Sequence, residues 1–297
     1  MLEKIQRLRA ETGAGIMECK SALLKAEGDT TRAMSLLMEK GFQLVQKKAE
    51  RAVESGVSYA EVVQGRAILL HVRCETPFVA ANPKFLELSG VIARAAGHPS
   101  VTNVSQLMQM PTEQPNSSVQ DVLQKMIMMF RENIVLQDVQ VIEGAFPYAY
   151  MHLKGRIGVV LTLMENQATK DVNQFVAKEL ALQIASMSPA VIRQEELSSQ
   201  ELEAIQHEID HEMTLDPTYQ GKPDQVLARI RQGKLEKQLR QRCLLEQPYI
   251  RDDSIRVRQF LKQQEKLHQT TFEILRFIRH EQVIDLENAA CCATMRF

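Results

Sequence analysis

Apolar residues recur along the chain with two spacings, and the change from one to the other separates its segments. In residues 1–45 they lie three or four positions apart, which predicts three short helices. A break at residues 12–15 ends the first helix, Gly28 ends the second, Asp29 caps the third, and Gly41 is expected to end it. We therefore expect a small three-helix head, followed by a charged helical linker at residues 46–56.

The next segment changes to strand-like patterning. Residues 57–63 and 67–73 flank a Gln64-Gly65-Arg66 turn, which predicts a hairpin, and a helix is expected from about Asn82. Residues 119–130 predict a Met-rich helix and residues 134–142 a strand. The methionines of that helix are interpreted as core side chains rather than cofactor ligands: Met126, Met128 and Met129.

An internal repeat with an offset of 90 residues follows from direct comparison of the chain with itself. Gly65-Arg66 matches Gly155-Arg156, and further pairs agree: Phe85 with Phe175, Ala95 with Ala185, Pro99 with Pro189, and Val101 with Val191. Each copy consists of a strand pair and a helix that is stopped by proline. This predicts an α+β protein with two repeated α+β subdomains, at residues 57–140 and 141–280.

The second copy is interrupted by a segment of strongly divided charge. Residues 195–216 contain eight acidic residues and no Lys or Arg, whereas residues 222–242 contain seven basic and two acidic residues. Each half carries an apolar seam: Leu202, Ile205, Ile209 and Met213 in the first, and Val226, Ile230, Leu235 and Leu239 in the second. We expect an antiparallel coiled-coil hairpin inserted at about residues 195–245.

The end of the chain is expected to contain a helix and a returning strand. The helix is placed from Ser254 to about Gln264 and the strand at residues 271–279. Residues 281–297, with the adjacent Cys291 and Cys292, are expected to form a C-terminal tail.

Composition narrows the class of protein. The 297 residues are 44% apolar with a formal net charge of −1, which is ordinary for a globular protein and gives no electrostatic reason to expect nucleic-acid binding. No apolar run approaches about 18 residues and no signal peptide is recognisable, so no membrane association is expected. Five cysteines without a C-x-x-C pair fit reduced thiols in a cytoplasmic protein.

One motif suggests an enzyme. The residues His207-Glu208-Ile209-Asp210-His211 satisfy the H-E-x-x-H pattern of zinc peptidases. The two histidines lie opposite the apolar seam on a charged helix, and a catalytic zinc also needs a cleft and a third ligand. We interpret them as solvated and retain a zinc peptidase only as an alternative. Phosphate-loop and nucleophile-elbow motifs are absent, so we expect a non-enzyme without metal, cofactor or directly bound nucleotide.

The ring of Phe78, between the hairpin and the following helix, has two interpretations. It is either a core residue that packs the helix onto the sheet or a wedge, a side chain presented to a partner. The repeat favours the wedge, because the second copy has Glu165-Asn166-Gln167-Ala168 at the same junction and no aromatic ring. A feature of one copy alone is not required by the fold that both copies share.

Five stretches, in order, resemble one protein family. The sequence Cys74-Glu75-Thr76-Pro77-Phe78-Val79-Ala80-Ala81-Asn82 resembles the Thr-Asp-Phe-Val signature of bacterial elongation factor Ts. The similarity runs from Leu2 to about Phe277. The other four stretches are Thr12-Gly13-Ala14-Gly15-Ile16-Met17-Glu18-Cys19-Lys20, Gly155-Arg156-Ile157-Gly158-Val159, Gly221-Lys222-Pro223 and Gln247-Pro248-Tyr249-Ile250.

The resemblance implies a UBA-like head and a guanine-nucleotide exchange factor that binds elongation factor Tu and promotes GDP release. It implies that Thr76, Pro77, Phe78 and Val79 disturb the partner's magnesium site, with Phe78 as the inserting ring. It also implies that His152 acts near the partner's phosphate loop, and that one part of the head contacts the GTPase domain: Leu8, Arg9, Ile16 and Met17. The coiled coil and second subdomain would hold a further partner domain.

The chain departs from the family pattern in two places. Pro77 stands where the family usually has Asp, and proline fixes the backbone but supplies no carboxylate. Beyond Phe277 the family's C-terminal helix is short or absent. The proline leaves open an alternative, a paralogue or adaptor that binds elongation factor Tu without exchange activity.

Overall fold

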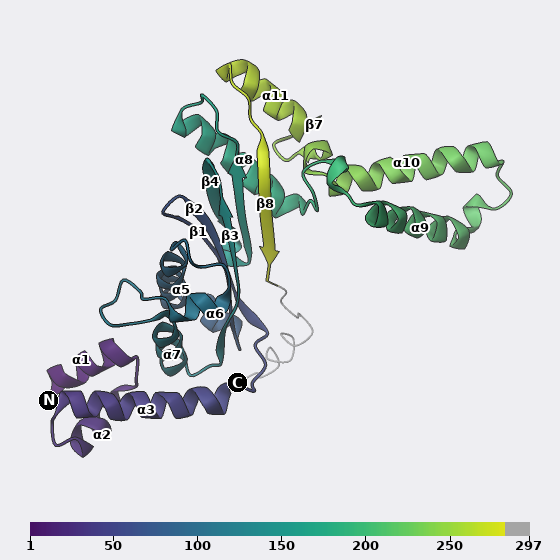
Figure 1. The fold of residues 1–297 in the computed structure, drawn as a ribbon. Helices are drawn as coiled ribbons and strands as arrows, with labels where there is room; N and C mark the ends of the chain where they lie inside the picture. Colours follow the sequence, from purple (N-terminus) through teal and green to yellow (C-terminus); the bar gives the residue numbers. More distant parts are fainter. Residues whose placement is uncertain (283–297) are drawn as a thin grey trace. The chain divides into compact units, whose positions relative to one another are not determined.

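The computed structural model describes residues 1–282, and it begins with three helices (Figure 1). These are α1 (Leu2–Thr12), α2 (Ile16–Lys25) and α3 (Thr30–Lys48). Gly13 ends α1 in a left-handed conformation with φ of 75°, and the Asp29 carboxylate caps α3 by accepting from the N–H groups of Thr31 and Arg32. The three predicted helices are confirmed, and their apolar faces share one buried core: Ile5, Leu8, Ala14, Cys19, Ala22, Leu23, Ala26, Ala33 and Leu37.

The predicted end of the third helix at Gly41 is wrong, because α3 continues to Lys48. Gly41 is buried against the Met128 side chain, with which a Cβ at position 41 would overlap. The glycine thus permits close approach of another helix rather than ending its own. The first residues of the predicted linker, up to Lys48, belong to α3.

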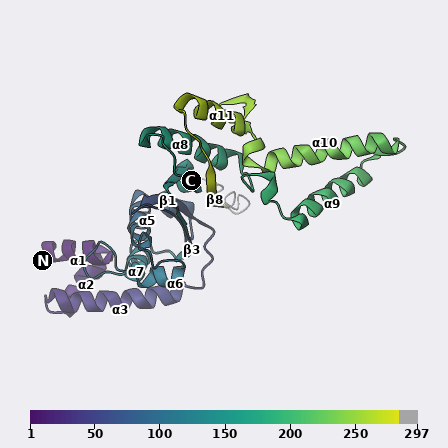
Figure 2. The same cartoon turned by 45° about the horizontal axis from the view of Figure 1, so that its top comes forward.

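The first sheet is antiparallel with strand order β1-β2-β3, and it confirms the predicted hairpin and strand. Its strands are β1 (Ser55–Val63), β2 (Arg66–Cys74) and β3 (Ile134–Glu143). Three helices gather beside it, α5 (Pro83–Ala96), α6 (Val104–Gln109) and α7 (Val119–Phe130) (Figures 1 and 2). Their core includes Phe85 and Met126, both fully buried, so the core assignment of Met126 is confirmed.

A second set of strands has the order β4-β5-β8. These strands are β4 (Phe146–His152), β5 (Ile157–Leu163) and β8 (Ile274–Glu281), and α8 (Lys170–Met187) follows β5. At the 90-residue offset, β4, β5 and α8 correspond to β1, β2 and α5, as the repeat predicts. The correspondence fails at one core position, since Phe85 is buried whereas Phe175 is 46% exposed.

Within residues 1–282, the chain divides into two compact units, residues 1–160 with residues 280–282, and residues 161–279. The boundary therefore falls inside β5 and β8, and the predicted domain limits remain predictions. The described residues also contain four short 3₁₀ helices: Leu153–Gly155, Gln194–Glu196, Pro217–Tyr219 and Leu244–Glu246.

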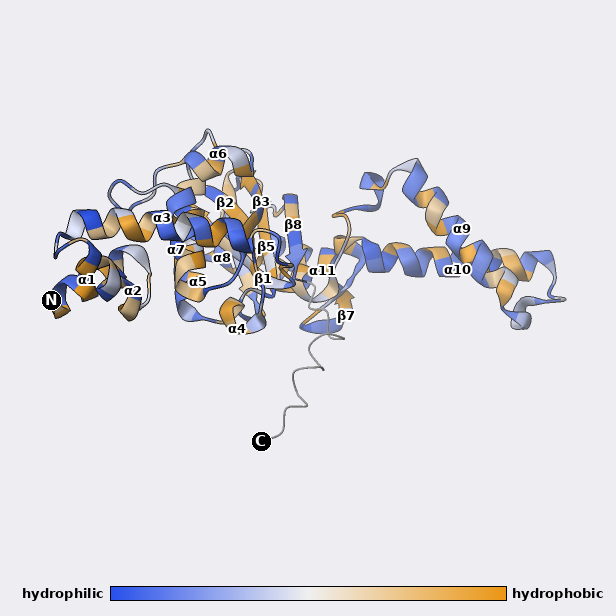
Figure 3. Ribbon diagram, turned by 90° about the horizontal axis from the view of Figure 1, so that it is seen from below, coloured by the Kyte–Doolittle hydropathy of each residue, from blue (hydrophilic) through white to orange (hydrophobic). Residues whose placement is uncertain are grey.

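The charged insertion forms two helices, α9 (Ser199–Leu215) and α10 (Asp224–Arg242), joined by a turn (Figure 1). In α9 the buried residues are Ile205, Ile209 and Met213, as predicted. In α10 the predicted seam is wrong at Val226, which is exposed, because Leu227 packs against α9 instead. The remaining surface of α10 is mostly hydrophilic (Figure 3).

Charge complementarity joins the two helices of the insertion. Asp210 of α9 pairs with Arg231 of α10 at 2.5 Å, and Glu212 pairs with Lys234 at 2.7 Å. Apart from Lys234, which is half-buried, these side chains are exposed, so each pair contributes only about 0–1 kcal/mol. Their main effect is to fix which faces of the two helices meet.

The C-terminal helix begins later than predicted. It is α11 (Val257–His268), and Ser254 lies instead in β7 (Asp252–Arg256), which pairs with β6 (Pro248–Tyr249). The predicted returning strand is present as β8, although it starts at Ile274. The tail beyond Gln282, including Cys291 and Cys292, lies outside the described residues. Within residues 1–282, no helix combines the length and apolar character needed to cross a bilayer.

Candidate partner-binding site

The stretch between β2 and α5 folds into a short helix, α4 (Pro77–Ala80), which the sequence analysis did not predict. Thr76 is its N-cap, and the Thr76 Oγ1 accepts a hydrogen bond from the Val79 N–H at 3.4 Å. Pro77 occupies the first helical position, where no N–H is needed and where its fixed φ suits the helix. The proline therefore fits this turn without loss of a hydrogen bond.

The side chain of Phe78 is 84% exposed, whereas Val79 and Ala80 are half-buried against the core of the first sheet. Hydrophobic colouring marks α4 as an apolar segment at the protein surface (Figure 3). The structure excludes the interpretation of Phe78 as a core residue. Two of its neighbours anchor the helix and leave the ring facing outward.

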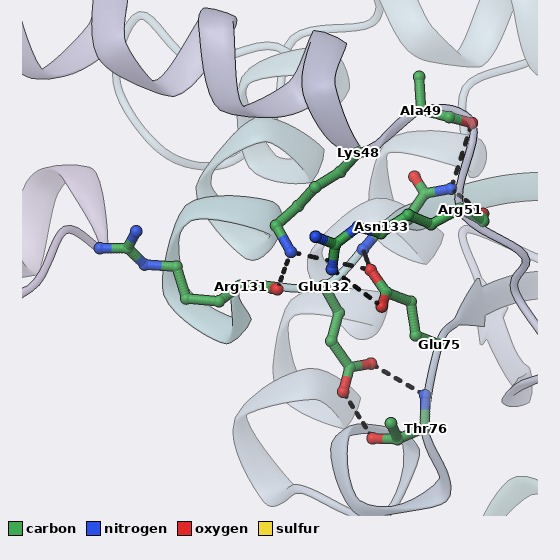
Figure 4. A network of polar contacts seen from close by, with 8 residues as sticks. All are labelled: Lys48, Ala49, Arg51, Glu75, Thr76, Arg131, Glu132 and Asn133. Carbon is green, nitrogen blue, oxygen red and sulfur yellow. Dashed lines mark hydrogen bonds and ion pairs between the residues drawn. The ribbon is translucent and has the colours of Figure 1, made fainter.

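A carboxylate from another part of the chain holds the start of α4 (Figure 4). Glu132, between α7 and β3, accepts hydrogen bonds from the Thr76 N–H at 3.0 Å and from the Thr76 hydroxyl at 2.6 Å. The Cys74 thiol donates to the Thr76 carbonyl at 3.2 Å. Burial, followed by the charge of Glu132, raises the pKa of Cys74 to about 12, so its thiol keeps the proton that it donates.

Glu75 is held next to Thr76 by a second set of contacts (Figure 4). Its carboxylate accepts from the Asn133 N–H at 2.5 Å and lies 3.8 Å from Lys48 Nζ and 3.4 Å from an Arg51 nitrogen. Lys48 is 8% exposed and also donates to the Arg131 carbonyl. A buried ammonium needs such partners, because its desolvation is otherwise costly.

The four residues assigned to the head do not share one environment. Ile16 and Met17, at the start of α2, are 53% and 73% exposed, and Arg9 is exposed as well. Leu8 is 1% exposed in the core of the head, so its side chain presents no surface to a partner. The prediction of a direct contact by Leu8 is therefore corrected: it supports the surface from within.

The candidate residue His152 is half-buried at the end of β4. Its Nδ1 lies 3.0 Å from the hydroxyl of Tyr150, two residues earlier on the same strand. No hydrogen bond of His152 within the described chain reaches the Thr76–Val79 stretch or the head. The structure therefore gives it an orientation but does not join it to the other candidate residues.

The histidines of the H-E-x-x-H motif, His207 and His211, are exposed on α9, as predicted. Glu208 between them pairs with Arg242 at 3.6 Å. Across residues 1–282, no cluster of three or more His, Cys, Asp or Glu side chains is arranged to hold a metal ion.

Sequence patterns do not reveal the residues that fix α4 and the residue before its cap, namely Glu132, Lys48 and Asn133. Glu132 lies 56 positions from Thr76, and no local pattern connects them. The only signal in the sequence was chemical. The Thr76 hydroxyl and the neighbouring Glu75 carboxylate both need hydrogen-bond partners when they are partly buried.

The Phe78 ring is exposed on a helix that is held in place by hydrogen bonds, and the head exposes the apolar side chains of Ile16 and Met17. Both features are typical of a protein that binds another protein. A family model described as elongation factor TS matches residues 75–282. Elongation factor Ts of Lawsonia intracellularis is 31% identical over 285 residues, covering 93% of this chain and 96% of that protein. The chain belongs to the elongation factor Ts family, a family of translation elongation factors.

Clostridial relatives give a similar level of identity. Elongation factor Ts of Clostridium botulinum (strain Eklund 17B) is 29% identical over 284 residues, covering 94% of this chain and 92% of that protein. Elongation factor Ts of Clostridium perfringens (strain SM101) is 29% identical over 282 residues, covering 94% of this chain and 91% of that protein. The relationship thus includes the head, which precedes the residues matched by the family model.

Proposed function

We propose that this protein is a guanine-nucleotide exchange factor for elongation factor Tu, which it binds in the GDP form to promote GDP release. The observation that carries the proposal is the 84% exposed ring of Phe78 on a helix whose start is held by Glu132. The family's Thr-Asp-Phe-Val signature falls on this helix. Phe78 is the inserting side chain, and it displaces groups that hold magnesium beside the bound GDP.

Exchange requires a difference in binding free energy. The factor must bind nucleotide-free GTPase more tightly than the GDP complex, and GDP must then weaken the factor by the same ratio. A thousandfold acceleration corresponds to about 4 kcal/mol of differential interaction. An interface with one or two buried aromatic anchors can supply this amount, because such anchors commonly contribute about 2 kcal/mol or more each.

Two further surfaces support the assignment. In the head, proposed to be UBA-like, the exposed Ile16 and Met17 together with Arg9 would contact the GTPase domain. The α9–α10 hairpin, proposed to be a coiled coil, and the second subdomain would hold a further domain of the partner. His152 would act near the partner's phosphate loop, from its position at the end of β4.

Pro77 keeps a second candidate function, a protein that binds elongation factor Tu without exchange. Since Pro77 has no carboxylate, it cannot compete electrostatically for magnesium, and disturbance of the magnesium site as proposed here depends on the Phe78 ring. The structure favours the ring, because Pro77 fits the first position of α4 and leaves Phe78 exposed.

Release of fluorescent GDP from elongation factor Tu, measured beside complex formation, separates the two functions. We expect the chain to accelerate release, and Pro77→Asp to change the rate by less than about threefold, within the range of a single exposed charge. A complex that forms without faster release, and that gains exchange activity with Pro77→Asp, would favour the holding function. Absence of any complex would exclude both.

A further inference from the structure

Three consecutive residues between α7 and β3 contact three different parts of the first unit. Arg131 ends α7 in a left-handed conformation with φ of 59°, and its N–H donates to the Ile127 carbonyl at 3.0 Å. The next residue, Glu132, binds the start of α4, and Asn133 binds Glu75 (Figure 4). We call residues 131–133 the junction.

The junction is bonded to the head as well. The Arg131 guanidinium donates to Glu18, which follows the exposed Met17, and Lys40 of α3 donates to the same carboxylate at 2.8 Å. The Arg131 carbonyl accepts from Lys48 near the end of α3. The Asn133 side-chain amide donates to the Ala49 carbonyl at 3.4 Å and the Arg51 carbonyl at 2.7 Å, which fixes the chain just after α3.

Glu132 determines how the cap of α4 is oriented. The Thr76 hydroxyl has one proton, and it is donated to Glu132 at 2.6 Å. Its lone pairs therefore remain available to accept the Val79 N–H, which belongs to the first turn of α4 and has no partner within that helix. Glu132 also accepts the backbone N–H of Thr76, so one carboxylate fixes both the side chain and the backbone at the N-cap.

We propose that Glu132 is a positioning residue for Phe78, and that the junction holds α4 and the head in one fixed arrangement. The inference rests on the proposed exchange function. With the start of α4 fixed before the partner arrives, the ring enters without the entropy loss of ordering its helix. Glu132 acts through Thr76 and need not touch the partner.

The order of α4 can be measured in the free protein, because the chain contains no tryptophan. In Phe78→Trp, the single indole reports motion at position 78 through its fluorescence anisotropy. We expect Glu132→Ala or Thr76→Val in this background to lower the anisotropy, whereas Thr76→Ser, which keeps the hydroxyl, retains the parent value. Unchanged anisotropy in both Glu132→Ala and Thr76→Val would overturn the proposal.

Exchange kinetics test the consequence, in chains that retain Phe78. We expect Glu132→Ala and Thr76→Val to lower the maximal rate of GDP release about tenfold, the loss of one hydrogen bond to a charged group, with nearly unchanged half-saturating concentration. Thr76→Ser, which keeps the hydroxyl, should lose less of the rate than Thr76→Val. The matched control is Glu113→Ala, which removes a carboxylate paired with Arg94 at 2.9 Å near the other end of α5 and should leave exchange unchanged.

The outcomes separate the two proposals. If the parent chain does not accelerate GDP release, the exchange function fails, and the anisotropy alone decides whether Glu132 orders α4. If the parent is active but Glu132→Ala and Thr76→Val retain its rate, the positioning role is overturned. The Thr76→Val and Thr76→Ser pair keeps the test decisive if Glu132→Ala does not fold.

Discussion

At the scale of single residues, Glu18 combines a local and a long-range role. Its carboxylate accepts from the Gly15 N–H at 3.1 Å at the start of α2, and it binds Lys40 and Arg131. Burial acts to raise the pKa of Glu18, but the hydrogen bonds from Lys40, Arg131 and the Gly15 N–H outweigh burial and lower it to about 2. The charged carboxylate therefore stabilises the folded head.

This pKa predicts a defined loss of stability in acid. Because the folded pKa is about 2 and the usual value is 4.5, the contribution is complete above about pH 4.5 and is lost as the pH falls toward 2. The contribution of the Glu18 carboxylate to the free energy of unfolding is at most about 3 kcal/mol. Urea unfolding between pH 5 and pH 2.5 should show a shallower pH dependence for Glu18→Gln, and also for Arg131→Met, than for the parent. Parallel curves would contradict the assigned interactions.

Residue environments were only partly predictable from the sequence. The exposure of Phe78 could be inferred, because the equivalent junction of the second copy lacks an aromatic ring. The burial of Leu8 could not be inferred, because an apolar residue in a family's contact region can either touch the partner or support the residues that touch it. The bond between Thr76 and Glu132 depends on the tertiary fold, and no periodic pattern encodes it.

At the scale of elements, the repeat places two glycines in equivalent positions with different surroundings. Gly65 has φ of 78° and no atom near the position of a Cβ, whereas Gly155 has φ of 90° and its Cβ would overlap with the Val57 side chain. Both need left-handed backbone, but only Gly155 also needs space. The two glycines therefore occupy the same position of the repeat, but a side chain at position 155 would meet a neighbour and one at position 65 would not.

The glycine pair yields a matched prediction. Gly65→Ala should destabilise the fold by about 1 kcal/mol, the cost of left-handed backbone for alanine. Gly155→Ala should cost about 2–4 kcal/mol, because overpacking against the buried Val57 adds to that strain. Thermal and urea unfolding of the two variants measure the difference. Equal losses would show that Val57 moves aside at no cost.

Element type was predicted better than element boundary. The offset of 90 residues located β4, β5 and α8, because strand and helix periodicities recur in both copies. The end of α3 was misplaced because Gly41 serves close packing against Met128, which local sequence rules interpret as a helix stop. The short α4 was missed because four residues are too few to show a period.

At the scale of the whole molecule, the α9–α10 hairpin can be separated from the rest of the second unit. Its helices pack on each other through Ile205 and Ile209, and a smaller cluster closes its base: Val191, Leu197, Leu202, Leu235, Leu239 and Cys243. Leu202 and Leu235 lie in that basal cluster together. The segment between them can therefore be replaced without removing the cluster.

Replacing residues 204–233 by a flexible linker of about four Gly and Ser residues tests this separation. We expect the remaining protein to melt as a folded unit within a few degrees of the parent. On the proposed function, the half-saturating concentration for GDP release should rise about tenfold through lost contact, while the maximal rate persists. A collapse of the maximal rate with unchanged half-saturation would show that the hairpin acts in exchange itself.

The opposite charges of residues 195–216 and 222–242 predicted that these two segments pack on each other, because opposite charges along two amphipathic helices favour their pairing. The division into two units could not be located from the repeat, because its boundary falls inside β5 and β8. All seven residues of β5 are buried, so its sequence pattern does not change at the boundary, and only the tertiary contacts reveal where one unit ends and the other begins.

The most direct test of the central claim is GDP release from elongation factor Tu with Phe78→Ala, compared with the parent and with Val62→Ala, a truncation of another exposed apolar side chain. We expect Phe78→Ala to slow release at least about tenfold, through the loss of an interface anchor, and to leave the melting temperature nearly unchanged. Val62→Ala should match the parent in both measurements. Release as fast with Phe78→Ala as with the parent, in protein that is equally folded, would contradict the claim that the exposed ring drives exchange.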